Sequence, residues 1–186
     1  MFLSNILKTN NPSADAKTMK DSNPCPEVPL VPQVNSQNEL FVCACGWFWF
    51  PQLRFDQLKG VVRTLVGYSG GNKLNPTYQS IKDHTEALLI EYDPNVISYE
   101  QLVTEWTKMH SLTRKSTKCQ YRSALWYLND EQKQWAEDVL EKIRTAQKID
   151  KIYSAVEPVT KFYRAEEYHQ NYIQKQGGGG GAACPY

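Results

Sequence analysis

The sequence predicts a single α+β domain, built as a two-layer sandwich of a sheet and helices, and three observations support this prediction. The chain has 186 residues, of which 41% are hydrophobic, which is enough for one packed core and too few for two comfortable ones. Long apolar runs typical of buried strands come first. Segments with helical periodicity then alternate with shorter strands, an order typical of α+β proteins.

Three strands and one helix are expected in the first half of the domain. Residues 39–45, ELFVCAC, form an unbroken apolar run, as in a buried central strand. Residues 60–71 are rich in β-branched side chains and end at a Gly-Gly turn. Residues 85–94 read as a third strand that stops at an Asp-Pro pair. A helix is expected from Pro51, because proline is tolerated in the first helical turn.

Helices and strands alternate in the second half. Ser98 with Gln101, and Asn129 with Gln132, have the spacing of capping boxes that begin helices. The predicted order is a helix at 98–110, a strand at 121–128, a helix at 129–147, a strand at 151–159 and a helix at 164–175.

Two tails are expected to flank this domain, which is predicted to span residues 39–175. Residues 1–38 are rich in Asn, Ser, Pro and Lys, and such a segment buries too little apolar surface to offset the entropy of ordering. Residues 176–186 contain a glycine run followed by Cys184, which is typical of a mobile tether.

Charge and cysteine content exclude several classes of function. The formal net charge is +1, so bulk charge gives no reason to expect a nucleic-acid or membrane partner. No apolar run approaches the roughly 20 residues of a transmembrane helix. We expect a cytoplasmic protein, with a mitochondrial or plastid location as the alternative. Five cysteines are an odd number without small-scaffold spacing, which argues against a disulfide framework.

The stretch FVCACGWFWFPQLRF, residues 41–55, places two cysteines where a strand leads into a helix. A helix N-terminus favours an anion, so a thiolate just before Pro51 would be stabilised as a nucleophile. The alternative is that Cys43 and Cys45 are small buried core residues, as free cysteines often are. A metal site built on the two cysteines is disfavoured, because no second pair of ligands has suitable spacing.

Several motifs together resemble the class A peptide methionine sulfoxide reductases. They are GVVRTLVGYSGGNKLNPTY, DHTEALLIEYDP, ISYEQL, QYRSALWY, NDEQK and FYRAEEYHQNYI, in this order over residues 41–173. The resemblance implies a ferredoxin-like mixed sheet packed with helices. It also implies thiol-dependent reduction of methionine-S-sulfoxide, peptide-bound or free, by a monomer that needs no cofactor and is regenerated by a thioredoxin-like reductant.

The nucleophile motif departs from the family pattern Gly-Cys-Phe-Trp-Gly, because this chain has Gly46-Trp47-Phe48-Trp49-Phe50. Counting back from Phe48 puts Trp47 in the nucleophile's place, whereas counting forward from Phe41 gives Cys45. The sequence thus leaves three explanations: an insertion after a working Cys45, loss of the cysteine at position 47, or a selenocysteine codon written as Trp. We expect Cys45 to be the nucleophile; the alternative is an inactive homologue that serves as a binding or scaffold module.

The remaining site residues follow from strand geometry and from the resemblance. Glu86 shares a strand face with Leu88 and Ile90, so burial should raise the pKa of its carboxyl toward neutrality. The resemblance assigns Glu86 the role of general acid, and gives Tyr78 and Tyr121 hydrogen bonds to the sulfoxide oxygen. Taken alone, Glu86 could be a solvated strand-end residue and each tyrosine an aromatic packing residue.

The resemblance also implies which residues surround the substrate's methyl group and which cysteine acts as the resolving thiol. Phe48 and Trp49 match the apolar cage for the S-methyl group, although such aromatics are ordinarily core. Cys184, on its glycine tether, is the expected resolving thiol, with Cys119 in reserve and an unpaired tail cysteine as the alternative. Ser116 stands nearest to the place where many relatives carry an aspartate.

Overall fold

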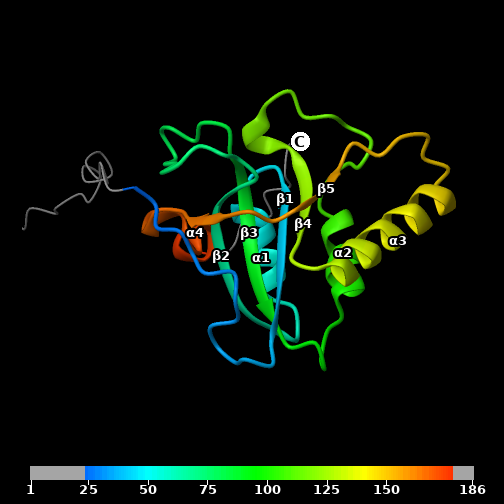
Figure 1. Ribbon diagram of the computed structural model, residues 1–186, viewed down its shortest axis with the longest axis horizontal. Coiled ribbons are helices and arrows are strands. Elements are labelled where there is room, and N and C mark those ends of the chain that lie inside the picture. Colours follow the sequence, from blue (N-terminus) through cyan, green and yellow to red (C-terminus); the bar gives the residue numbers. More distant parts are fainter. Residues whose placement is uncertain (1–23, 178–186) are drawn as a thin grey trace, which may run out of the picture.

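A mixed six-stranded sheet with strand order β5-β4-β1-β3-β2-β6 organises the computed structural model, which describes residues 24–177. Neighbouring strands are antiparallel except for the parallel pair β4–β5, and Figure 1 shows α2 and α3 beside the sheet. The α+β prediction is confirmed. The elements are β1 (Glu39–Cys45), α1 (Trp49–Asp56), β2 (Val61–Ser69), β3 (Thr85–Tyr92), α2 (Tyr99–Thr107), a 3-10 turn η1 (Cys119–Tyr121), β4 (Ser123–Tyr127), α3 (Asp130–Ala146), β5 (Ala155–Pro158), β6 (Phe162–Arg164), a 3-10 turn η2 (Glu167–His169) and α4 (Tyr172–Lys175).

Alternate residues of β1 build the two faces of the sheet. Phe41, Cys43 and Cys45 belong to the core cluster that also contains residues of α1, α2 and α3. Val42 and Ala44 belong to a second cluster on the opposite face, which the segment before β1 and the residues around β6 cover. The helices therefore form one layer, and both faces of β1 are buried, as its unbroken apolar sequence predicts.

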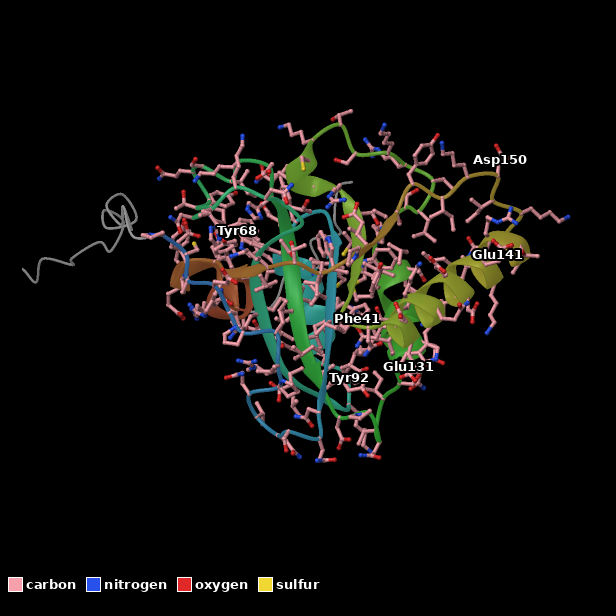
Figure 2. All side chains as sticks on the ribbon, in the orientation of Figure 1. Phe41, Tyr68, Tyr92, Glu131, Glu141 and Asp150 are labelled. Atoms are coloured by element: carbon pink, nitrogen blue, oxygen red, sulfur yellow. The ribbon has the colours of Figure 1, made fainter. Side chains whose placement is uncertain are left out.

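The helices α2 and α3 begin largely as expected. In α2, Ser98 and Gln101 make both hydrogen bonds of the predicted capping box. In α3, Asn129 caps the Gln132 amide, but the Gln132 side chain turns away to bind the backbone of Leu128 and Leu40. The buried residues of α3 face the sheet layer, whereas Glu131 and Glu141 project from the outer side of the helix (Figure 2). No helix in the described part of the chain is both long and apolar enough to traverse a bilayer.

The predicted closing helix at 164–175 is wrong. The chain instead forms the short strand β6, the turn η2 and the single helical turn α4, and Asn171 has a left-handed φ of 53° before α4. The cause is tertiary: the buried Gln170 side chain hydrogen-bonds both the amide and the carbonyl of Val66 in β2. The Asn171 amide binds the Gln52 side chain in α1, which fixes the bend.

The segment 24–38, predicted to belong to a flexible tail, packs against the sheet, so the domain begins before residue 39. Its Cys25 is 4% exposed, and the amides of Gln33, Val34 and Asn35 donate to the carboxylate of Glu91 at 2.8, 2.7 and 3.2 Å. The rest of the predicted N-terminal tail, residues 1–23, lies outside the described residues. So do residues 178–186, which include Cys184.

Candidate active site

The ends of three strands bring the predicted acid and the predicted nucleophile together. β1 and β3 pair in antiparallel register, with Phe41 opposite Ile90 and Cys43 opposite Leu88. Continuing this register by two residues places Cys45 opposite Glu86, on the same face of the sheet. Both residues line one narrow internal gap. Cys45, 4% exposed, is thus held between β3 and β4 and faces its predicted partner.

Glu86 has the environment of a general acid. Its side chain is 2% exposed, and burial raises the pKa of its carboxyl from 4.5 to about 7. Two hydrogen bonds oppose this rise: Gln120 Nε2 donates to Oε1 at 2.7 Å, and the Phe48 amide donates to Oε2 at 3.2 Å. The expected rise toward neutrality is confirmed, and near pH 7 the carboxyl holds a proton about half the time.

The two predicted tyrosines lie close to this carboxyl. Burial raises the pKa of Tyr78, and the nearby charges of Glu86 and Tyr121 raise it further. Tyr121 ends the turn η1, directly after the Gln120 that holds Glu86. The Tyr78 amide is fixed by Glu166 at 2.9 Å. Tyr78 therefore lies within electrostatic reach of both Glu86 and Tyr121.

The corner after β1 places Trp47 at the surface and Cys45 in the interior. Gly46 has a φ of 93°, a value that glycine adopts without strain, and the helix α1 starts three residues later. Trp47 is 36% exposed, and its indole lies edge-on to Trp49 with ring centroids 6.1 Å apart. Trp47 therefore lies at the surface of the corner, and Cys45 lies beneath it in the strand.

The helix N-terminus donates a hydrogen bond to the predicted acid, and the expected stabilisation of a Cys45 thiolate stays a prediction. α1 begins at Trp49, two residues before the predicted Pro51, and Phe48 is its N-cap residue. The Phe48 amide points to the Glu86 carboxylate. Cys45 lies four residues before the helix, outside the first turn in which a helix dipole has most effect.

The predicted methyl cage includes two residues that the sequence analysis did not assign to the site. Phe48 is 2% exposed and packs against His169 at a centroid distance of 5.2 Å. The Trp49 indole N–H donates to His169 Nδ1 at 3.2 Å, and its ring stacks on Tyr172 at 4.4 Å. The Tyr78 ring also packs against His169, with ring centroids 4.4 Å apart. Burial lowers the pKa of His169 to about 4, so the imidazole is neutral at pH 7.

Two other thiols of the described residues, those of Cys43 and Cys119, are less well placed for the site chemistry. Cys43 is fully buried, and burial raises the pKa of its thiol well above 9.0, so it stays protonated. Cys119 is exposed, and its Sγ donates to the Asp83 carbonyl at 3.3 Å. The hydroxyl of Ser116 binds the backbone of Lys118, which gives the loop before η1 a local turn and no carboxylate.

Comparison with known proteins identifies the family of this chain. The family model described as peptide methionine sulfoxide reductase matches residues 39–183. A peptide methionine sulfoxide reductase of Solanum lycopersicum is 38% identical over 183 residues, which cover 94% of this chain and 91% of the relative. Mxr1 from Saccharomyces cerevisiae in reduced form has a TM-score of 0.73 at 27% identity, over 82% of this chain and 93% of that chain. Mxr1 in complex with Trx2 has a TM-score of 0.58 at 25% identity, over 76% and 89%. This chain belongs to the peptide methionine sulfoxide reductase family.

Proposed function

We propose that this chain reduces methionine-S-sulfoxide, free or peptide-bound, to methionine, with Cys45 as the nucleophile. The observation that carries the proposal is that Cys45 and the buried Glu86 line one gap at the end of the paired strands β1 and β3. A carboxyl that is half protonated near pH 7 can deliver a proton to an oxygen and be reprotonated from water.

The chemical step is a two-electron exchange between two sulfur atoms. The sulfur of Cys45 attacks the sulfoxide, the S–O bond of the substrate breaks, and the oxygen stays on the cysteine. Glu86 supplies a proton to that oxygen as it leaves the substrate sulfur. The balance is one thiol and one sulfoxide giving one sulfenic acid and one thioether, so Cys45 is oxidised as methionine is formed.

The surrounding side chains bind the substrate and orient it. The hydroxyls of Tyr78 and Tyr121 can donate to the sulfoxide oxygen, where negative charge develops as the S–O bond breaks. Phe48 and Trp49, with His169 and Tyr172 packed behind them, provide an apolar wall for the S-methyl group.

A second thiol returns the enzyme to its reduced state. The Cys45 sulfenic acid condenses with the thiol of Cys184, releasing water and forming a disulfide. A thioredoxin-like dithiol then reduces this disulfide by exchange. The similarity to Mxr1 in complex with Trx2 supports such a partner. A monomeric state and a cytoplasmic location, with mitochondrion or plastid as the alternative, stay predictions.

Purified protein with dithiothreitol and a methionine sulfoxide substrate tests the proposal. Cys45→Ser should lose activity by more than about a thousandfold, because the hydroxyl is a far weaker nucleophile. Cys43→Ala is the matched control, since it removes the neighbouring buried thiol and should retain most of the rate. Labelling with a reagent specific for sulfenic acid should mark Cys45 in a Cys184→Ser variant. Undiminished turnover by Cys45→Ser would refute the assignment.

A second candidate, a binding module without turnover, is the alternative that the sequence leaves open. Trp47 stands at the corner next to Trp49, in the place that counting back from Phe48 gives to the nucleophile, and it is 36% exposed. Trp47→Cys separates the two functions. An inactive unmodified chain that gains activity through Trp47→Cys would show that the site lost its nucleophile at position 47. Activity that depends on Cys45 and is unchanged by Trp47→Ala would support the reductase.

A further inference from the structure

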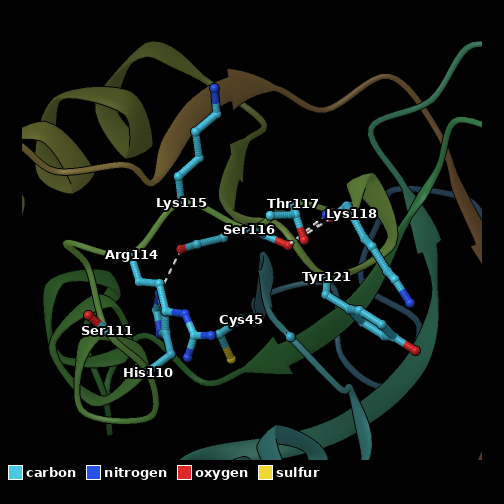
Figure 3. A pocket seen from close by; sticks show the side chains of 11 residues that line it. Cys45, His110, Ser111, Arg114, Lys115, Ser116, Thr117, Lys118 and Tyr121 are labelled. Carbon is cyan, nitrogen blue, oxygen red and sulfur yellow. Dashed lines mark hydrogen bonds between the residues drawn. The ribbon is translucent and has the colours of Figure 1, made fainter. Parts of the chain in front are cut away.

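A hollow of about 160 Å³ opens beside Cys45, on the side of β4 (Figure 3). Its walls are the loop from His110 to Lys118 and the ends of β1 and β4, and Tyr121 lines it next to the proposed sulfoxide site. A cavity of about 150 Å³ can hold a molecule of the size of benzene. The hollow is therefore large enough for a small side chain or a carboxylate group.

The lining of this hollow is basic and contains no acidic residue. Arg114, Lys115 and Lys118 contribute three cations, and Ser111, Ser116 and Thr117 contribute hydroxyl groups. Within residues 24–177, none of the three cations forms an ion pair with a carboxylate. The whole chain has 21 basic and 20 acidic side chains, so this local excess is not a property of its composition.

The positive charge comes from the rim and not from the imidazole in the wall. Burial lowers the pKa of His110 to about 4. Its Nδ1 donates to the Trp106 carbonyl at 3.2 Å, which leaves Nε2 to accept from the Ser123 hydroxyl at 2.6 Å. His110 is neutral at pH 7, whereas lysine and arginine stay charged there. His110 therefore adds no positive charge to the hollow at pH 7.

We propose that this hollow binds a carboxylate of the substrate, next to the sulfoxide that Cys45 attacks. The proposal rests on the proposed function, because the substrate must reach Cys45 and Tyr121, which the hollow shares with the reaction site. Arg114 extends toward Cys45 inside the hollow, whereas Lys115 and Lys118 extend outward from its rim (Figure 3). A cation inside the hollow, with hydroxyl donors in the lining, is complementary to an anion, and a hollow with one sign of charge concentrates such ligands.

Two sources of the carboxylate share this chemistry. One is an aspartate or glutamate that flanks methionine sulfoxide in a peptide. The other is the α-carboxylate of free methionine sulfoxide, which lies three carbon atoms from its sulfur. In both cases Arg114, Lys115 and Lys118 set substrate preference and take no part in the S–O bond cleavage.

Matched substrates test the inference with the full chain. Kinetics are compared for methionine sulfoxide peptides that differ only in a flanking Glu or Gln, and for free methionine sulfoxide against its methyl ester. Exposed charge pairs contribute factors of about 1.5 to 5 each, so three cations should favour the carboxylate substrates about tenfold in KM. The preference should shrink in 0.5 M salt, as screening predicts.

The triple variant R114Q/K115Q/K118Q should abolish the preference and leave kcat for the neutral substrates unchanged. The control R54Q/K59Q/K142Q removes the same charge at exposed positions that do not line the hollow. This control should keep the preference for the carboxylate substrates. Preference for the Glu peptide alone, or for free methionine sulfoxide alone, would identify the source of the carboxylate. Equal KM values for charged and neutral substrates, or equal losses in both triple variants, would overturn the inference.

A binding measurement separates the inference from the proposed function. Peptides in which methionine sulfone replaces the sulfoxide bind without being reduced, so their Kd can be measured by fluorescence anisotropy. Tighter binding of the Glu sulfone peptide, without turnover of any sulfoxide, would support the carboxylate site and refute the reductase. Turnover without any charge preference in Kd or KM would support the reductase and refute the carboxylate site.

Discussion

Glu86→Gln should change how the free energy of unfolding depends on pH, and the sign follows from the burial of this carboxyl. The pKa of Glu86 is about 7 in the folded protein and near 4.5 in an unfolded chain. Between these values the folded state keeps a proton that the unfolded state has released, so raising the pH favours unfolding. Stability from the protonated Glu86 is complete below pH 4.5 and is lost as pH rises through about 7.

The size of the effect follows from the two pKa values. A tenfold change in proton concentration corresponds to about 1.4 kcal/mol, so the difference between 4.5 and about 7 amounts to about 3 kcal/mol. Gln cannot ionise, so Glu86→Gln should remove this loss. Urea denaturation, followed by tryptophan fluorescence, measures the free energy of unfolding at pH 5 and pH 8. From pH 5 to pH 8 the free energy of unfolding of the variant should rise by about 3 kcal/mol relative to that of the unmodified chain.

A second buried carboxylate on β3 provides a control of opposite sign. Burial alone would raise the pKa of Glu91, but hydrogen bonds from Gln33, Asn38 and Val34 outweigh it and lower the pKa. The stability that Glu91 supplies is therefore present at neutral pH and lost on acidification. Glu91→Gln should cost about 2 kcal/mol or more at pH 7 and less at low pH. The same pH trend in both variants would refute the reasoning from burial and hydrogen bonding.

The reaction itself gives further expected outcomes. The value of kcat/KM should fall as pH rises through about 7, because Glu86 must be protonated to deliver its proton. Gln120→Leu should move this falling limb to higher pH, since the Gln120 hydrogen bond lowers the pKa of Glu86; an unmoved limb would contradict that role. Tyr78→Phe and Tyr121→Phe should each lower kcat about a hundredfold without changing the circular dichroism spectrum. Cys184→Ser should keep turnover with dithiothreitol and lose it with thioredoxin, and equal rates with both reductants would exclude Cys184 as the resolving thiol.

The sheet and the acid were predictable because their signals are local. A strand buried on both faces is typically a continuous apolar run, and β1 is one from Leu40 to Cys45, whereas β3 has a shorter apolar run from Ala87 to Ile90. The alternation of side chains along β3 was enough to place Glu86 in the helix-covered layer. The start of α2 followed from the spacing of Ser98 and Gln101, which is also a local pattern.

Features that depend on distant partners were not predictable. Gln170 breaks the expected closing helix because β2 accepts its side chain, and nothing near Gln170 in the sequence shows this. The hydrogen bond of Gln120 to Glu86 spans 34 residues, although its neighbour Tyr121 was already a candidate. The sequence analysis did not assign His169 to the site, and its place among Phe48, Trp49 and Tyr78 emerges only from the fold.

The contacts of Glu91 also decide where this protein can be shortened. The family match begins at residue 39, yet the backbone amides that donate hydrogen bonds to the Glu91 carboxylate come from residues 33–35. A fragment starting at residue 39 would lose these donors and Asn38 and would uncover the face of the sheet that the segment before β1 covers, leaving Arg63 as the charged neighbour of Glu91 at 3.2 Å. Such a fragment should be insoluble or unfolded at neutral pH although it retains every residue proposed for catalysis within the match. We therefore expect the smallest unit that folds to begin before residue 39, where the family model begins.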